Sequence, residues 1–312
     1  MSRMQARELA KQTSLDSNPY FANTVPFLGT ISKSAQGMPR IHTVESRIRH
    51  VLLHYHIFKN SGSSIDAILE ANFGYKMAYL HGRTSASLVT NRDLLSFLHS
   101  NPDIQVVSSH HLRPKKPLSD LLFFFDIIFV RHPLDRLRSM YEFYRRSGET
   151  RDPLVQEAHS HSMASFMDLL LRYHPHLVNN AQVNFLANKG CCARPVDARD
   201  LDIASAIVCG AAVPGVSEMF DLSINLAKYF LYPTFGAIEA SVAPVNVCPD
   251  RSPELDVRLE AMRQACGSII YDALLAANQL DLHLVDRVRA ELKRRSNSLP
   301  AVAHPLELAQ FQ

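Results

Sequence analysis

A short apolar run at residues 49–58 (RHVLLHYHIF) passes directly into a Gly- and Ser-rich turn, and this junction constrains the fold more than any other feature of the chain. The run is rich in Val, Leu, Ile and aromatic residues, which is typical of a central strand covered on both faces. Ile65, Ile68 and Leu69 then recur at helical spacing. The pattern predicts a strand, a loop at 59–64 and a helix in immediate succession.

The same alternation continues along the chain. Apolar runs predict further strands at 104–109 and 123–130, and the spacing of leucines predicts a helix over 91–100. Pro133 suits the first turn of a helix that follows the third strand. Short buried strands that alternate with helices are typical of an α/β fold. We therefore expect a P-loop-like central parallel sheet flanked by helices.

The second half of the chain has a mostly helical pattern. An apolar run there favours one more strand, at 206–216. The helices expected from apolar spacing are 165–173, 179–188, 219–232 and 254–295. We expect a single domain over 49–295, preceded by a polar N-terminal extension at 1–48 and followed by a tail at 296–312.

Charge, hydropathy and cysteine usage narrow the class of protein. The 312 residues include 33 Lys+Arg and 30 Asp+Glu, and a net charge of +3 is too small to favour a nucleic-acid partner. No apolar stretch reaches ~18 residues, and the N-terminus lacks the apolar core of a secretory signal, so we expect no membrane span. The 5 cysteines are scattered and odd in number. That usage is typical of reduced thiols in a cytoplasmic protein.

The loop at 59–64 has the composition of an anion-binding turn. Amides at a helix N-terminus point toward a bound anion, and the helix dipole adds a favourable potential. Gly62 permits close approach of the backbone, and Lys59 supplies a positive charge. The order differs from the GxxxxGK[ST] loop of nucleotide triphosphatases, because Lys59 precedes Gly62. An ordinary turn between strand and helix is the alternative interpretation.

A second basic segment follows the third expected strand. Residues 130–146 (VRHPLDRLRSMYEFYRR) hold five Arg against two acidic residues. Arg131 stands at the carboxyl end of a strand, where open parallel sheets bind ligands, and Ser139 lies two turns into the helix. A guanidinium and a hydroxyl can hold a phosphate there. A solvated basic helix face is the alternative, and it is our interpretation of Arg136 and Arg138.

Together the two segments resemble the signatures of sulfotransferases that use 3′-phosphoadenosine-5′-phosphosulfate, closest to the carbohydrate (2-O- and Golgi-type) branch. The family's PKxxGT[ST] loop, which binds the 5′-phosphosulfate, is similar to FKNSGSS at 58–64. Its RxPxxRxxSxY element, which binds the 3′-phosphate, is matched by RHPLDRLRSMY at 131–141. Phe58 stands where the family has Pro, and Asn60 stands where it has Thr or Ser. Weaker echoes extend the resemblance over roughly 50–285.

The resemblance implies roles for individual residues. A histidine base is implied in SSHH at 108–111, with His110 or His111 taking the proton of the acceptor hydroxyl. Lys59 is implied as the cation that stabilises the leaving oxygen. The donor-binding residues that the resemblance implies are Lys59, Asn60, Ser61, Gly62, Ser63, Ser64, Arg131, Ser139, Arg251 and Ser252.

The expected activity is in-line transfer of a sulfuryl group from 3′-phosphoadenosine-5′-phosphosulfate to a hydroxyl, with a glycan or glycolipid as the expected acceptor. No metal is expected, because the histidine pairs at 54/56, 159/161 and 174/176 lack a third ligand at useful spacing. The alternatives are a nucleotide or small-molecule kinase on a related sheet and a non-catalytic nucleotide-binding scaffold. The acceptor's identity and the oligomeric state stay open.

Overall fold

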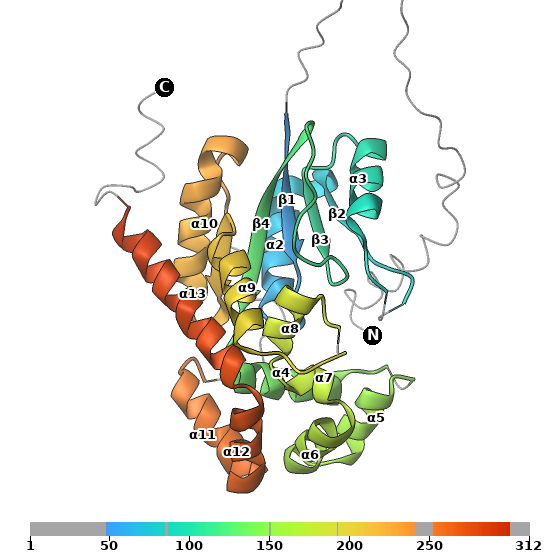
Figure 1. Cartoon of the computed structure of the whole chain (residues 1–312), viewed down its shortest axis with the longest axis vertical. Coiled ribbons are helices and arrows are strands. Elements are labelled where there is room, and N and C mark those ends of the chain that lie inside the picture. The colour runs from blue at the N-terminus through green and yellow to red at the C-terminus, as the bar shows by residue number, and fades with distance from the viewer. Residues whose placement is uncertain (1–47, 85–86, 150, 192, 241–251, 300–312) are drawn as a thin grey trace, which may run out of the picture. The chain divides into compact units, whose positions relative to one another are not determined.

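The computed structural model contains a five-stranded parallel sheet in the order β2-β3-β1-β4-β5 (Figure 1). The structure describes residues 48–84, 87–149, 151–191, 193–240 and 252–299. The strands are β1 (Arg49–Tyr55), β2 (Met77–Tyr79), β3 (Val106–Ser109), β4 (Leu122–Val130) and β5 (Val213–Val216). The expected α/β fold with a central parallel sheet is confirmed.

The helices fill the connections between strands and most of the second half. Two short 3₁₀ segments are also present: η2 (Gly74–Lys76) precedes β2, and η3 (Ser217–Met219) precedes α10. The α-helices are α2 (Gly62–Phe73), α3 (Asn91–Ser100), α4 (Pro133–Arg146), α5 (Pro153–Ser160), α6 (Met163–Tyr173), α7 (Pro175–Val178), α8 (Ala181–Asn188), α9 (Ala198–Cys209), α10 (Phe220–Phe235), α11 (Leu255–Cys266), α12 (Ser268–Ala277) and α13 (Gln279–Asn297).

One strand prediction needs correction, and one strand was missed. The expected strand at 206–216 is wrong over its first part, because residues 206–209 complete α9 and only Val213–Val216 form β5. A capping box at Asp197 starts α9, and its buried residues recur at helical spacing, so the apolar run continues a helix that is already under way. Strand β2 was not predicted, since its three half-buried residues leave no periodic signal.

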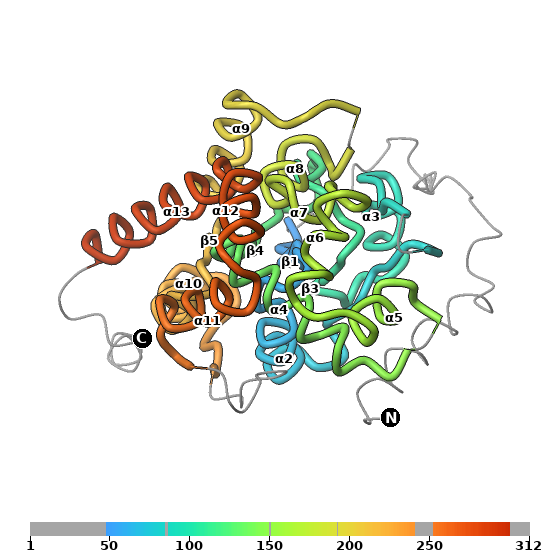
Figure 2. The backbone as a smooth tube through the Cα atoms, turned by 90° about the horizontal axis from the view of Figure 1, so that it is seen from below, coloured from blue at the N-terminus to red at the C-terminus, as the bar shows by residue number. Residues whose placement is uncertain are grey.

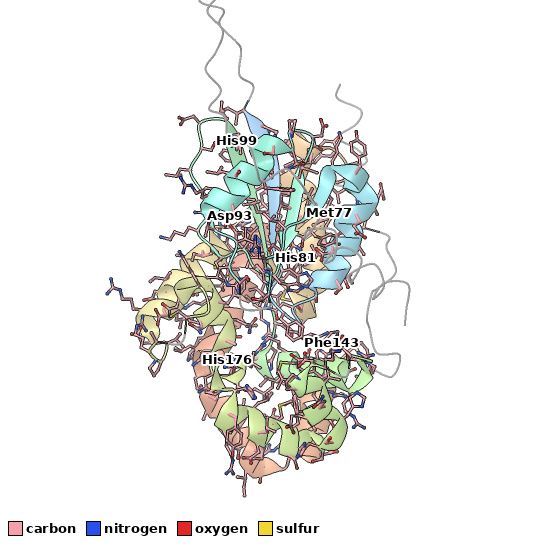
Figure 3. All side chains as sticks on the ribbon, turned by 90° about the vertical axis from the view of Figure 1, so that its right-hand side faces the viewer. Met77, His81, Asp93, His99, Phe143 and His176 are labelled. Atoms are coloured by element: carbon pink, nitrogen blue, oxygen red, sulfur yellow. The ribbon has the colours of Figure 1, made fainter. Side chains whose placement is uncertain are left out.

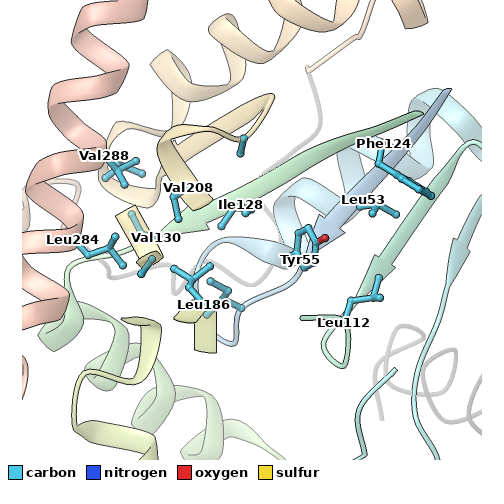
Figure 4. Packing of buried hydrophobic residues seen from close by; sticks show 14 of the residues in the cluster. Leu53, Tyr55, Leu112, Phe124, Ile128, Val130, Leu186, Val208, Leu284 and Val288 are labelled. Atoms are coloured by element: carbon cyan, nitrogen blue, oxygen red, sulfur yellow. The ribbon is translucent and has the colours of Figure 1, made fainter. Parts of the chain in front are cut away.

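Alternate residues of β1 pack on opposite faces of the sheet. Leu53 and Tyr55 join a hydrophobic cluster with side chains of α3, α8, α9 and α13 (Figure 4). Leu52 joins the cluster of α2 and α10 on the other face. Figure 2 shows α2 and α10 on one side of the sheet and α8 and α9 on the other. The continuous apolar run of β1 therefore reflects a strand buried on both faces.

A third hydrophobic cluster joins α4, α5, α6, α7, α11 and α12, with Leu137, Met140 and Phe166 fully buried in it. Figure 1 shows these helices beneath the carboxyl ends of the strands. From His50 onward the chain forms one compact unit, and the expected extension at 1–48 and tail at 296–312 fall almost wholly outside the described residues. Within the described residues, no helix combines the length and apolar character that a membrane crossing needs.

Candidate functional site

The loop between β1 and α2 has an uncommon backbone. Lys59 and Ser61 have φ angles of 67° and 61°, in the left-handed region that residues with a Cβ seldom adopt. Such conformations persist where the surroundings hold them, and they cluster at ligand sites. Gly62 and Ser63 are the first two residues of α2, so their amides have no acceptor within the helix. The backbone at 59–64 is therefore suited to bind an anion.

Asn60 fastens this loop to the neighbouring strand. Its side chain is 1% exposed, and Nδ2 donates to the Phe129 carbonyl at 2.9 Å and to Gln182 Oε1 at 2.8 Å. Gln182, on α8, also accepts from the Arg131 amide at 2.9 Å and donates to the Arg131 carbonyl at 2.8 Å. The amide nitrogen of Asn60 is thus used inside the protein, where it joins the first loop to the end of β4.

Arg131 links the two sequence segments directly. One of its Nη atoms donates to the Lys59 carbonyl at 2.9 Å, although 72 positions separate the two residues. Nε donates to Asp135 at 2.8 Å, and the second Nη lies 2.7 Å from the same carboxylate oxygen. The side chain of Arg131 is buried, and these contacts use one N–H group on each nitrogen. The guanidinium therefore holds the anion-binding loop in place through the carbonyl of Lys59.

Asp135 is shared between two buried arginines. Arg258, on α11, approaches the same carboxylate at 2.8 Å and 3.2 Å and also donates to the Ser252 carbonyl at 2.9 Å. This carboxylate therefore ties the start of α4 to the segment that precedes α11. Arg136, expected on a solvated face, is instead 4% exposed and donates to the Leu177 carbonyl at 2.6 Å, so that interpretation is wrong.

The remaining donor-binding candidates come from the loop at 59–64, from α4 and from the segment before α11. The Lys59 ammonium lies 4.4 Å from the centroid of the Phe143 ring, which places a cation over an aromatic face of α4. Ser61, Ser63 and Ser64 are half-buried in the loop and first turn of α2, and Ser139 is half-buried on α4. Ser252 accepts from the amide of Glu254 at 3.3 Å. Arg251 lies outside the described residues.

The buried carboxylate of Asp66 accepts hydrogen bonds from several polar side chains close to the loop. Asp66, on α2, accepts at Oδ1 from His54 Nδ1 at 2.8 Å and from the Ser108 hydroxyl at 2.6 Å, and at Oδ2 from His56 Nδ1 at 2.9 Å. Burial alone would raise the pKa of Asp66, but His54 and His56 lower this pKa well below its ordinary value. The expectation that no histidine pair meets a third ligand-type group is therefore wrong.

His110 lies beside the loop, as the adjacency of β1 and β3 requires. Its Nδ1 donates to the His56 carbonyl at 2.8 Å, so Nε2 of a neutral ring carries a lone pair. Burial, His56 and His81 lower the pKa of His110 well below its ordinary value, which keeps the ring neutral near pH 7. Figure 3 shows His81 near the carboxyl ends of the strands, with Phe143 on the helical part below.

His111 presents the opposite tautomer. The backbone amide of Gly82 donates to His111 Nδ1, so a neutral His111 carries its proton on Nε2. Burial lowers the pKa of His111, with a further contribution from Arg113. Of the two histidines that the sequence offered as a base, only His110 presents an unprotonated Nε2.

Sequence reasoning missed several residues that organise this edge. His54, in β1, and His56, directly after it, fall on the same face by strand alternation, and Asp66 lies one turn after Gly62, so the pattern of the strand and helix held a signal. No local pattern could join Gln182 or Arg258 to the loop, because each comes from a helix far along the chain.

Gly62 has no room for a side chain. An ideal Cβ there would lie 2.0 Å from Cδ2 and 2.1 Å from Nε2 of His56, whose ring Asp66 holds. We expect Gly62→Ala to lower the free energy of unfolding by about 1–3 kcal/mol, measured by urea denaturation, because the overpacked ring must shift. Gly148→Ala is the control, since nothing lies within 4 Å of its Cβ position. Equal stability of the two variants would contradict the close packing of His56 on the loop.

Comparison with known proteins adds a relative without a known activity. No model of a protein family matches the chain. The chain is 24% identical over 247 residues to an uncharacterized protein of Archaeoglobus fulgidus, and the match covers 77% of this chain and 96% of that protein. The similarity thus spans nearly the whole length of the archaeal protein.

Proposed function

We propose that the protein transfers a sulfuryl group from 3′-phosphoadenosine-5′-phosphosulfate to a hydroxyl of an acceptor, with a carbohydrate as the acceptor class. One contact carries the proposal: Arg131 donates to the Lys59 carbonyl at 2.9 Å. This bond joins the two segments that resemble the donor-binding signatures, and it does so at the carboxyl edge of a parallel sheet, where such folds bind ligands.

The donor's 5′ end is assigned to the loop. The amides of Gly62 and Ser63 and the hydroxyls of Ser63 and Ser64 supply hydrogen-bond donors at the start of α2. Lys59 supplies the positive charge that offsets the negative charge developing on the leaving phosphate. We assign Ser139 to the 3′-phosphate side. We assign to Arg131 mainly the role of positioning the loop, because its side chain is buried and contacts Asp135 and the Lys59 carbonyl.

His110 is assigned as the general base. Its Nε2 lone pair takes the proton of the acceptor hydroxyl while the hydroxyl oxygen forms a bond to sulfur. The bond between sulfur and the phosphate oxygen breaks, and its electron pair stays on the phosphate. The products are a sulfate ester, adenosine 3′,5′-bisphosphate and a protonated His110, which then releases its proton to water. Residues of this chain thus supply both the base and the positive charge that offsets the charge on the leaving group.

We also propose a cytoplasmic location. Cys191, Cys209 and Cys266 are free thiols, which fits a reducing compartment. The donor is made in the cytosol, so the enzyme and its cosubstrate would meet there.

The proposal is tested with adenosine 3′,5′-bisphosphate and with the donor. We expect the protein to bind the bisphosphate without Mg²⁺ in calorimetry, and Lys59→Met to weaken this binding about 10–100-fold through loss of a charged hydrogen-bond donor. Lys115→Met, which removes an exposed lysine distant in sequence from the loop, is the matched control. Mass spectrometry of a panel of glycans incubated with the donor then identifies a sulfated product.

Other outcomes separate the alternatives. Binding that requires Mg²⁺, together with phosphate transfer from ATP, would indicate a kinase instead. Bisphosphate binding without any sulfated product across glycan, glycolipid and small phenol acceptors would favour a non-catalytic scaffold. No bisphosphate binding at all would refute the proposal.

A further inference from the structure

The polar side chains around Asp66 lie next to His110, the candidate base, and the proposed sulfotransfer step makes no use of them. They come from three elements: His54 and His56 from β1 and the residue after it, Asp66 from α2, and Ser108 from β3. Asp66 is 6% exposed, His56 9%, His54 1% and Ser108 0%. Water therefore does not reach the carboxylate easily, and its charge acts on the side chains around it.

The hydrogen bonds assign the protons in this group. An ionised carboxylate only accepts hydrogen bonds, so both His54 Nδ1 and His56 Nδ1 carry hydrogens that point to Asp66. Neutral His56 then has its lone pair on Nε2. That edge of the ring faces Gly62, as the 2.1 Å approach of Nε2 to the site of a Gly62 Cβ indicates.

His56 determines the position of His110 in two ways. Its backbone carbonyl accepts from His110 Nδ1 at 2.8 Å, and its ring lies 3.8 Å from the His110 ring, centroid to centroid, at an interplanar angle of 38°. Two imidazolium ions at this separation would repel each other strongly, so His110 can take up a proton only while His56 stays neutral. The negative charge of Asp66 favours that singly protonated state of the pair.

We propose that Asp66 is a positioning residue for His110: by holding His56 in one orientation and one tautomer, it fixes the ring and the carbonyl that orient the general base. This inference rests on the proposed sulfotransfer for its catalytic consequence. Its structural part, the orientation and proton affinity of His110, can be measured on the free protein. A carboxylate that orients an imidazole and stabilises the imidazolium formed during reaction is an established arrangement in other enzymes.

The charged and titratable groups that face this histidine pair come from several elements. Burial lowers the pKa of His56 as well, while its hydrogen bond to Asp66 raises it. Asp66 also raises the pKa of His110, against larger contributions from burial, His56 and His81. The titratable and charged neighbours of the histidines at this site are His54 on β1, Lys59 in the loop, Asp66 on α2, His81 after β2, and His111 and Arg113 after β3.

The test is Asp66→Asn, which keeps the size of the side chain and removes its charge. We expect kcat to fall about 10²-fold, as for a small misplacement of a reacting group, with KM for the donor within about twofold. Loss of the negative charge disfavours the protonated form of His110, so the acid limb of the kcat profile moves to lower pH. Asp200→Asn is the control, because Asp200 is also buried but belongs to the capping box at the start of α9 and pairs with Arg194.

A second measurement does not depend on turnover. In protein with ¹⁵N-labelled histidines, the His110 signals are assigned by their loss in His110→Gln. We expect the His110 titration to move to lower pH in Asp66→Asn and to stay in place in Asp200→Asn. Ring-nitrogen shifts should show hydrogen on Nδ1 of neutral His110 in the unaltered protein.

The outcomes distinguish the two proposals. If the unaltered protein transfers no sulfate, the proposed function fails, and the titration alone decides on Asp66. If sulfate is transferred but Asp66→Asn changes only stability, with the acid limb and the His110 titration unmoved, the positioning role is refuted. Stoichiometric Zn²⁺ binding that disappears in Asp66→Asn would also overturn it, since His54, His56 and Asp66 would then be metal ligands.

Discussion

Replacing His110 by Gln is expected to lower kcat about 10²–10⁴-fold, since the acceptor hydroxyl then has no group to take its proton. KM for the donor should change little, because His110 contacts His56 and His81 rather than the loop at 59–64. The measurement is the initial rate of sulfate-ester formation with the acceptor identified by mass spectrometry. The acid limb of the rate should lie below pH 6.5, the ordinary pKa of histidine, because burial lowers the pKa of His110 and activity is lost only where the ring becomes protonated.

Two further variants make the assignment of the base specific. His111→Gln should cost far less than His110→Gln, because Nδ1 of His111 accepts from the Gly82 amide and its Nε2 carries a proton. His99→Gln, in the last turn of α3, is the control for loss of any histidine (Figure 3). A larger loss in His111→Gln would transfer the role to His111, and full activity in both variants would exclude a histidine base at the end of β3.

Replacing Asp135 by Ala is expected to have the largest effect on stability, about 3–5 kcal/mol in the free energy of unfolding. The carboxylate lies between Arg131 and Arg258, whose side chains are 7% and 4% exposed. Its removal leaves two buried guanidinium groups without their counterion, and desolvation of such a charge is costly. Urea denaturation followed by far-UV circular dichroism measures the effect.

The control for this variant is a partly exposed ion pair on the same helix. Glu142 pairs with Arg138 at 2.8 Å, with side chains 25% and 22% exposed. Glu142→Ala should therefore cost at most about 1 kcal/mol, because solvent screens the pair. If Asp135→Ala cost no more than Glu142→Ala, the buried bridge between α4 and α11 would not contribute as described. Asp135→Ala should also weaken bisphosphate binding, since Arg131 would no longer be held against the Lys59 carbonyl.

Local sequence signals predicted much of the fold. The apolar runs of β1, β3 and β4 were found because buried parallel strands are mostly apolar, and α4 was found because Pro133 marks its first turn. The errors have a physical cause as well. β2 is too short to show a period, and the first part of the run at 206–216 belongs to a helix whose capping box lies upstream at Asp197.

The candidate site likewise contains residues that the local sequence reveals and residues that only tertiary contacts reveal. Residues 59–64 could be singled out from their order alone, since the amides at the start of a helix that follows a strand can bind an anion. The burial of Arg136 could not, because the periodicity of α4 does not reveal that α7 covers this side chain and that its Leu177 carbonyl accepts from the guanidinium.

By itself, the amino-acid order determined the elements and the chemistry each loop offers, because hydrophobic period and turn composition act over a few residues. Only the tertiary structure decided which of those groups meet: placing β3 beside β1 brings His110 to the His56 carbonyl, and placing β4 on the other side brings Arg131 to Lys59. Strand order depends on how faces of the sheet are covered by helices from distant parts of the chain. That packing is a property of the whole domain, so no local window of sequence contains it.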